Sequence, residues 1–365
     1  MSPRPPARAR RLLTGLRLAA QGIARPAAAG PVDAVRSLLA MQGQDYPGVL
    51  WSVGLRSGAT EAEVEAAHAS GALVRSWPLR GTLHLVAAED LGWMLSLTGE
   101  RTARLAAARH RELGLDQADF ARAAAIARER LAGGARADRA ELLEAFRAGG
   151  IPTDGQRGPH LLGNLAHTGL VVLCGRTEYA LLDEHVPDPR RLEPDAAADE
   201  LALRYFTGHG PATVRDLAWW SGLPLTLVRE ATARVRDRLD AVEVEGVEHL
   251  MRSGLEPDGD GVHALPGFDE YLLGYADRSA ALAPEHADAI VPGGNGMFRP
   301  TIVARGEVVG TWSRDRTRTA VRVTASPFGR FSATAQRRLA ATLRRYGRFL
   351  GREVDLGAQP AVSKG

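Results

Sequence analysis

The sequence predicts a mainly α-helical protein with β wings, an α+β fold in which three tandem winged-helix motifs precede a C-terminal β-rich domain. Two observations lead to this prediction. First, three helices followed by a β-hairpin recur three times along the 365 residues, and this is the element order of a winged helix. Second, glycine, proline and alternating apolar residues become more frequent after residue 262, which indicates strands.

Residues 1–30 are predicted to be a flexible, basic N-terminus. They begin Met-Ser-Pro-Arg-Pro-Pro and contain several further arginines. The segment lacks the long apolar stretch and the cleavage site of a signal peptide. No apolar run elsewhere approaches the ~20 residues that a membrane span needs, so we expect no membrane partner.

The first winged-helix unit is predicted over residues 31–118. Apolar residues recur there at helical spacing and then alternate, as in a strand pair. The predicted helices are Val32–Gln42, a short segment near Gly48–Leu55, and Glu61–Ser70. The predicted strands are Leu73–Trp77 and Thr82–Val86, joined across Arg80-Gly81.

The second unit is predicted over residues 119–199, of which residues 183–199 form a proline-containing connector. The predicted helices of this unit are Phe120–Leu131, Arg139–Phe146 and Gly158–Thr168, and its hairpin strands are Val171–Cys174 and Thr177–Leu182. The third unit, over residues 200–261, is the clearest copy. Its predicted helices are Leu201–Gly208, Ala212–Ser221 and Leu225–Leu239, followed by a hairpin that turns at Gly246.

The β-rich C-terminal domain is predicted over residues 262–354, followed by a tail at residues 355–365. Its predicted strands are Thr301–Ala304, Val308–Trp312 and Ala320–Val323, and an arginine-rich helix covers Gln336–Arg352. Residues 299–352 hold 13 arginines against two carboxylates, a local charge of +11 in a chain of net charge +3. A basic region on an otherwise acidic protein suggests a surface that faces a polyanion, although a solvated helical face is an alternative.

The remaining composition limits the possible chemistry. Cys174 is the only cysteine, which excludes internal disulfides and fits a reducing compartment. The histidines are scattered, no glycine-rich phosphate loop opens a helix, and no Gly-x-Ser-x-Gly motif occurs. We therefore expect neither a metal nor a cofactor. The only lysine, Lys364, lies in the tail, which makes Schiff-base chemistry through lysine unexpected.

The segment Gln42-Gly43-Gln44 is the strongest candidate for catalysis. If a helix ends there, a spacing of two residues aims both amides into one cavity, where they can hold a water molecule without being strong bases. Such a water suits hydrolysis of the N-glycosidic bond of an N7- or N3-alkylated purine, because the departing base is already cationic. The alternative is that both glutamines cap the end of the helix.

The candidates for contact with DNA are basic and polar residues on two segments. The predicted hairpin over residues 74–85 carries Arg75, Arg80, Thr82 and His84, with Arg80 near the tip, where wings commonly meet phosphate. A lone histidine such as His84 is also common as a hydrogen-bonded structural residue. The C-terminal candidates are Arg299, Arg305, Arg314, Arg316 and Arg318.

The segment Leu265–Arg278 carries two further carboxylates, Asp269 and Glu270. They could act as bases, with Tyr271 as a stacking residue. A structural role for these carboxylates and for the neighbouring aromatic residues is the interpretation we favour.

Together these motifs resemble the tandem winged-helix DNA glycosylases of bacteria, the AlkZ-like family, over roughly residues 30–350. The resemblance rests on Leu-Leu-Ala-Met-Gln-Gly-Gln-Asp, Arg-Gly-Thr-Leu-His-Leu-Val, Gly-Pro-Ala-Thr-Val-Arg-Asp-Leu-Ala-Trp-Trp-Ser-Gly-Leu, Leu-Pro-Gly-Phe-Asp-Glu-Tyr-Leu-Leu-Gly-Tyr-Ala-Asp-Arg and Val-Val-Gly-Thr-Trp. It implies that Gln42 and Gln44 catalyse base excision, as in the Gln-x-Gln branch of the family. The family pattern has an apolar residue between the glutamines, so Gly43 is a departure.

The resemblance further implies action on bulky alkylpurine adducts or interstrand crosslinks, which in some members protects producers of genotoxic antibiotics. We therefore expect a monofunctional DNA glycosylase that binds double-stranded DNA as a monomer, in the cytoplasm and associated with the nucleoid. The alternative is a non-catalytic winged-helix protein, either a regulator or a genotoxin-resistance factor. A regulator usually dimerises on a palindromic site, whereas this sequence shows no dimer helix.

Overall fold

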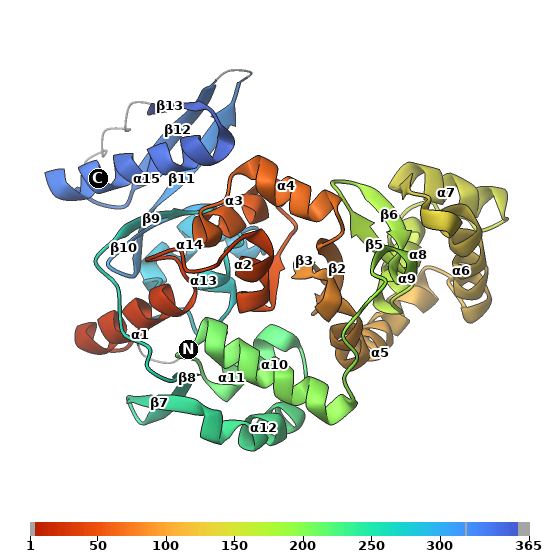
Figure 1. Cartoon of the computed structure of the whole chain (residues 1–365), viewed down its shortest axis with the longest axis horizontal. Coiled ribbons are helices and arrows are strands. Elements are labelled where there is room, and N and C mark those ends of the chain that lie inside the picture. Colours follow the sequence, from red (N-terminus) through yellow and green to blue (C-terminus); the bar gives the residue numbers. More distant parts are fainter. Residues whose placement is uncertain (1–3, 318–319, 357–365) are drawn as a thin grey trace.

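The structure, a computed structural model, describes residues 4–317 and 320–356. Arg318, expected to contact DNA, and residues 357–365 of the predicted tail lie outside the described residues. The predicted α+β class, mainly helical with β-hairpins, is confirmed. Figure 1 shows an elongated molecule with helices α6 and α7 at one end and the C-terminal sheet with helix α15 at the other.

The first unit has the predicted helices and hairpin, with one strand added. Its elements are α2 (Pro31–Leu38), β1 (Ala40–Gln42), α3 (Tyr46–Ser57), α4 (Glu61–Ala69), β2 (Leu73–Leu79) and β3 (Thr82–Ala87). The sequence-based helix Val32–Gln42 was too long. It ends at Leu38 because Leu39 has a φ of 68°, which an α-helix cannot accommodate, and Ala40–Gln42 pairs with β3 as a strand.

The second unit repeats this order after the long helix α5 (Ala88–Glu112), which the sequence analysis did not define. Its elements are α6 (Gln117–Leu131), η1 (Ala132–Gly134), β4 (Ala137–Asp138), α7 (Arg139–Ala148), α8 (Arg157–His167), β5 (Val171–Cys174), β6 (Glu178–Leu181) and α9 (Leu182–His185). Strands β2 and β5 pair through Arg75 and Leu173. The two units therefore share one six-stranded sheet, in the order β1-β3-β2-β5-β6-β4.

The third unit has a separate two-stranded sheet. Its elements are α10 (Pro194–His209), α11 (Val214–Ser221), α12 (Leu225–Arg234), η2 (Arg236–Arg238), β7 (Leu239–Val244) and β8 (Val247–Arg252). An isolated bridge between Ala212 and Leu250 occupies the place that β1 and β4 have in the other units. Thr213 then caps α11 in a capping box with Asp216, as Asp138 caps α7 with Glu141.

The C-terminal domain is a five-stranded sheet, in the order β13-β12-β11-β10-β9, with α15 packed against it. Its elements are β9 (Val262–Leu265), α13 (Glu270–Leu273), η3 (Pro284–His286), α14 (Ala287–Ile290), η4 (Pro292–Gly294), β10 (Thr301–Ala304), β11 (Glu307–Arg316), β12 (Ala320–Pro327), α15 (Ala333–Leu350) and β13 (Glu353–Leu356). Strand β13 crosses the predicted boundary between the domain and the tail. Its last two residues, 355 and 356, were expected in the tail but pair with β12. Helix α15 presents Leu339, Leu343 and Tyr346 to the sheet core.

The predicted flexible N-terminus is wrong for residues 7–20, which form helix α1 (Ala7–Ala20). The residues from Leu13 to Leu18, three of them leucines, are all buried, so this part of the helix is enclosed by the rest of the protein. The Arg17 guanidinium lies 3.6 Å from the centre of the Tyr275 ring and donates to the carbonyl of Pro211 at 3.0 Å. The free energy gained by burying these leucines therefore orders a segment for which the prolines and arginines suggested disorder.

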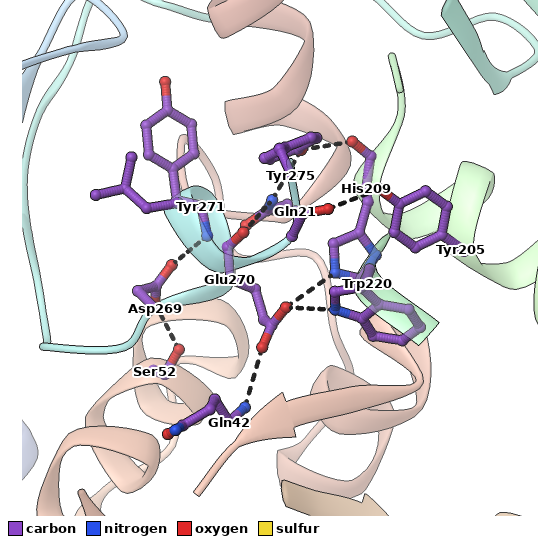
Figure 2. Close-up of polar contacts among 12 residues, drawn as sticks. Gln21, Gln42, Ser52, Tyr205, His209, Trp220, Asp269, Glu270, Tyr271 and Tyr275 are labelled. Carbon is purple, nitrogen blue, oxygen red and sulfur yellow. Dashed lines mark hydrogen bonds and ion pairs between the residues drawn. The ribbon is translucent and has the colours of Figure 1, made fainter. Parts of the chain in front are cut away.

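A buried ion pair joins the C-terminal domain to the first unit. Both oxygens of the Asp269 carboxylate accept hydrogen bonds at 2.9 Å from the Arg56 guanidinium, and the Ser52 hydroxyl donates at 2.5 Å. The Asp269 side chain also caps α13 by accepting from the backbone N–H of Tyr271. This arrangement fixes the start of α13 against α3, and Figure 2 shows Asp269 between Ser52 and the backbone of Tyr271.

We expect Arg56→Met to destabilise the protein by about 3–5 kcal/mol, because the Asp269 carboxylate would stay buried without its cation. Urea denaturation followed by circular dichroism measures this loss. The matched control is Arg104→Met, which removes an exposed pair with Glu100 and should change the unfolding free energy by less than about 1 kcal/mol. Equal effects of the two substitutions would contradict the structural role of Asp269.

Candidate functional site

The side chains of Gln42 and Gln44 meet at the end of β1. The Gln42 side-chain amide donates to the side-chain oxygen Oε1 of Gln44. The backbone N–H of Gln44 donates back to the side-chain oxygen Oε1 of Gln42 at 3.0 Å. Gln42 is only 6% exposed, whereas Gln44 is exposed. The inner glutamine thus orients the outer one, whose side chain is exposed.

The glutamines lie in a segment that distinguishes the first unit from the other two. In the second and third units, the short strand or bridge runs directly into a capping box. In the first unit, Gly43 and Gln44 intervene before the N-cap residue Asp45, whose side chain makes no capping bond. Asp45 instead accepts from Arg314 of β11, at 3.2 Å. The capping box that follows the short strand in the other two units is therefore absent from the first unit, where the paired glutamines lie.

Glu270 holds the inner glutamine from behind. Its carboxylate, in a side chain 1% exposed, accepts from the backbone N–H of Gln42 at 3.0 Å and from the Trp220 indole at 2.9 Å, and it lies 3.4 Å from Nε2 of His209. Figure 2 shows Glu270 between these groups. Burial would raise the pKa of Glu270, but its hydrogen bond and charge interaction with His209 outweigh burial and lower that pKa to about 2.

Arg75 supports the loop between the glutamines, which corrects its predicted contact with DNA. Its side chain is buried, lies 4.5 Å over the Tyr46 ring, and donates to the carbonyl of Gly43 at 3.3 Å and to the carbonyl of Arg176. On the other side, the Gly43 N–H donates to Leu83 at 2.7 Å. Gly43 is thus held from both sides, although it departs from the apolar residue of the family pattern.

Gly43 also lies close to the neighbouring strand. A Cβ atom at this position would lie 3.2 Å from the backbone nitrogen of Leu85 and 3.5 Å from the Arg75 side chain. A larger residue therefore requires a shift of a few tenths of an ångström in β3, whereas its contact with Arg75 would be an ordinary one.

The prediction that His84 contacts DNA is wrong, because its side chain is 0% exposed. His84 stands opposite both Gln42 and Ser76 in the sheet, and its Nδ1 lies 2.8 Å from the carbonyl of Thr82. Burial, assisted by the positive charge of Arg80, lowers the pKa of His84 to about 4. The ring is therefore a neutral residue of the interior at pH 7.

Arg80 and Thr82, at the hairpin tip, make their hydrogen bonds within the protein. Arg80 donates to the carbonyl of Trp220 at 2.5 Å, and its guanidinium lies 4.4 Å over the Trp219 ring. Thr82 donates to the carbonyl of Leu79 at 3.2 Å. The tip is therefore bound to the end of α11, where the sequence analysis expected a free wing.

The C-terminal arginines divide into two groups. Arg314 and Arg316 lie beside the first unit, where they pair with Asp45 and with Glu61 at 2.8 Å. Arg299 and Arg305 are exposed, but Gly306, next to Arg305, is packed against Thr14 of α1 and accepts from the Tyr271 hydroxyl at 2.6 Å. Of the C-terminal arginines that the structure describes, Arg314 contacts the residue after the glutamines, Asp45, and Arg316 contacts α4 through Glu61.

Two residues of this site were not identified from the sequence. Arg176 lies exposed in the β5–β6 turn of the second unit, and its carbonyl anchors Arg75. Asp45 links the glutamine segment to β11. The sequence signal for Asp45 was its place before Tyr46-Pro47, at the start of a helix, whereas Arg176 had no local signal.

Two further findings concern the residues that the structure describes. No group of three or more histidine, cysteine or carboxylate side chains among them is arranged to hold a metal ion. No helix among them is long and apolar enough to cross a membrane.

Comparison with known proteins agrees with this architecture. The model of the family "DNA glycosylase AlkZ-like" matches residues 35–349. The interstrand DNA cross-link repair glycosylase of Streptomyces sahachiroi is 29% identical over 311 residues, which are 77% of this chain and 81% of that protein. The solved structure of the Streptomyces sahachiroi DNA glycosylase AlkZ superposes with a TM-score of 0.78 and 24% identity, covering 95% of this chain and 98% of that one.

We expect the buried His84 to make the fold sensitive to acid. In the unfolded chain the pKa of His84 is 6.5, whereas burial lowers it to about 4 in the folded protein. Protons therefore bind the unfolded state more tightly, and the free energy of unfolding falls as the pH drops from 6.5 to 4. Between pH 7 and pH 4 the unfolding free energy of the wild type should fall by about 3 kcal/mol more than that of His84→Asn. If urea denaturation gave the same pH dependence of the unfolding free energy for the wild type and for His84→Asn, this result would contradict the burial of a neutral ring.

Proposed function

Since this chain belongs to the family of AlkZ-like DNA glycosylases, we propose that it hydrolyses the N-glycosidic bond of N7- or N3-alkylated purines in duplex DNA, with water positioned by Gln42 and Gln44. The observation that supports this proposal most strongly is the contact between the two amides, one buried and one exposed. The pair lies in the segment where the first unit departs from the repeat. Local rules are commonly broken at functional sites.

The proposed reaction needs little acid–base help from the protein. Alkylation at N7 or N3 makes the purine cationic, so the electron pair of the C1′–N9 bond leaves with a base that becomes neutral. The water oxygen then bonds to C1′ of the cationic sugar, and the proton that it loses passes to bulk water beside the exposed Gln44. Amide dipoles can hold this water and face the positive charge without being protonated.

Each neighbouring group has a defined part in the proposed site. Gln42 orients Gln44, Glu270 fixes the backbone of Gln42, and Arg75 fixes the carbonyl of Gly43. A site held by buried hydrogen bonds keeps its geometry without reorganisation, which is how such dipoles lower a barrier. A lyase step through lysine would need a Schiff base with the sugar. The only lysine is Lys364, in the predicted tail, so we propose hydrolysis without a lyase step.

The proposed path of DNA crosses the face around Gln44. Arg176 of the second unit is linked to the glutamine segment through Arg75, and Arg314 of β11 is linked to it through Asp45. Arg316 lies further along β11, paired with Glu61, and guanidinium groups commonly meet phosphates. The relative from Streptomyces sahachiroi is named for interstrand cross-link repair. We propose that bulky or crosslinked purines, including genotoxin adducts, are substrates of this chain too, and that it acts as a monomer.

We expect Gln42→Ala and Gln44→Ala each to lower the single-turnover release of N7-methylguanine by about 10²–10³-fold, the usual effect of removing one dipole from a preorganised site. Affinity for the duplex should stay within about twofold, since phosphate contacts supply most binding energy. A labelled duplex, cleaved at abasic sites after the reaction, reports base release, and a gel-shift titration of the same duplex reports affinity.

The control for this experiment is Gln117→Ala, on an exposed part of α6, which should release base at the wild-type rate. If binding and rate fell together in the Gln42 and Gln44 variants, the glutamines would be structural. If the wild type released no base but bound DNA, the proposal would give way to a non-catalytic binding protein.

A second substitution separates the two roles considered for Arg75. As a support of the glutamine loop, Arg75→Met should lower the rate of base release at saturating DNA by about tenfold or more, because a misplaced catalytic group loses its effect. Its dissociation constant for DNA and the dependence of that constant on salt should remain as in the wild type. A weaker, less salt-dependent complex with an unchanged saturated rate would instead restore the predicted phosphate contact.

A further inference from the structure

A second candidate site lies at the tip of the β2–β3 hairpin. A cleft of about 600 Å³ opens there between α5, α8 and the segment that joins α11 to α12. The first, second and third units each contribute a wall. The cleft does not include Gln42 or Gln44, and its volume lies in the range of pockets for a small organic ligand.

The charge of this cleft is unbalanced. Arg80, Arg101 and Arg139 line it, whereas no aspartate or glutamate is among its lining residues within the described chain. Arg139 is exposed and forms no ion pair within the described residues. Guanidinium groups that face a cleft without carboxylates favour an anionic ligand.

The walls of the cleft are suited to a planar ring. Trp77 and Tyr179 come from the hairpin and from β6, and Leu105 of α5, 72% exposed, stands at the edge. The Tyr179 hydroxyl has no hydrogen-bond partner among residues 4–317 and 320–356, and Nε2 of His167 is buried without one. These groups and the Asn164 amide are available to the polar edge of a base. Aromatic side chains also provide the stacking surface that displaced bases prefer.

The cleft adjoins the glutamine segment through the hairpin itself. The backbone N–H of Gly43 donates to Leu83 at 2.7 Å, and Gly81, at the rim of the cleft, is two residues further along. Two strand residues span about 7 Å. The rim at Gly81 therefore lies about 7 Å along the hairpin from Leu83, the residue that binds the backbone of Gly43.

We infer that this cleft binds one nucleotide displaced from the DNA helix beside the lesion. The inference rests on the proposed function and adds to it a subsite for an anionic ligand with an aromatic ring. A neutral apolar molecule would leave three guanidinium groups without a counter-charge. An intact duplex is too wide for a cleft of this volume, whereas a single nucleotide has both the ring and the phosphate that the walls can accommodate.

Gly163 offers a direct way to fill the cleft. It lies in α8 at the cleft wall, and a Cβ atom there would meet no atom within 4 Å. Gly163→Trp should therefore direct its ring into the cleft from a Cβ atom that meets no neighbour, and Gly163→Ala is the matched control that leaves most of the cleft open. Alanine is also the better helix former, so the control should fold at least as well as the wild type.

The experiment compares two undamaged duplexes of the same sequence, one fully paired and one with a single unpaired 2-aminopurine. We expect the wild type and Gly163→Ala to bind the unpaired nucleotide at least about fivefold more tightly than the paired duplex, with a change in 2-aminopurine fluorescence from stacking. Gly163→Trp should lose the preference and keep its affinity for paired DNA. Arg139→Ala should weaken the preference, whereas Arg111→Ala, on α5 outside the cleft, should not.

Three outcomes would overturn the inference. They are an absent preference in the wild type, a preference that survives in Gly163→Trp, and complete competition by free deoxyadenosine monophosphate, which would identify the ligand as a free nucleotide. Because the duplexes carry no lesion, the result does not depend on catalysis. Gln42→Ala/Gln44→Ala should keep the preference, so failure of the glycosylase proposal and failure of this inference are distinguishable.

Discussion

The rest of the structure depends on a buried negative charge at Glu270. A carboxylate in the interior must be surrounded by donors, because its unpaired burial costs several kcal/mol. The donors here come from distant parts of the chain: the backbone of Gln42 in the first unit, and His209 and Trp220 in the third. Its neighbour Asp269 binds Arg56 in the same way. Satisfying two charges in one short segment thus fixes how two units and the C-terminal domain meet.

This constraint explains why the glutamine pair can be rigid although it lies in a break of the repeat. The second and third units end their short strand in a capping box, which is a stable local arrangement. The first unit lacks this cap, and contacts with distant residues hold the segment instead. Glu270 accepts from the backbone of Gln42, Arg75 donates to Gly43, and Arg314 pairs with Asp45. The break leaves Gln44 exposed while the residues around it are held. Exposure with a fixed geometry is what a site that orients water needs.

The sequence predicted the features that depend on local patterns and missed those that depend on distant contacts. Helix and strand order in the three units was predictable because periodicity and caps are local. The three-residue strand Ala40–Gln42 was mistaken for helix, since only its pairing with β3 reveals it. The spacing of Gln42 and Gln44 predicted that both amides enter one cavity at the end of a helix. In the structure they follow a strand, and the Gln42 amide donates to the side-chain oxygen of Gln44. The hydrogen bond from Arg80 to the end of α11 was not predictable, because Trp220 lies 140 positions away. The burial of His84 was not predictable either, because alternation along a strand does not show which face of the sheet is covered.

The measurement that tests the central claim most directly is a double-mutant cycle between Glu270 and Gln42. Single-turnover release of N7-methylguanine at saturating DNA would be compared for the wild type, Glu270→Gln, Gln42→Ala and the double variant. If Glu270 acts by holding Gln42 in place, the double variant should be about as slow as Gln42→Ala alone, so that the effects are not additive. Rate losses that multiply would show that Glu270 supports the fold independently of the glutamine pair and would contradict the account.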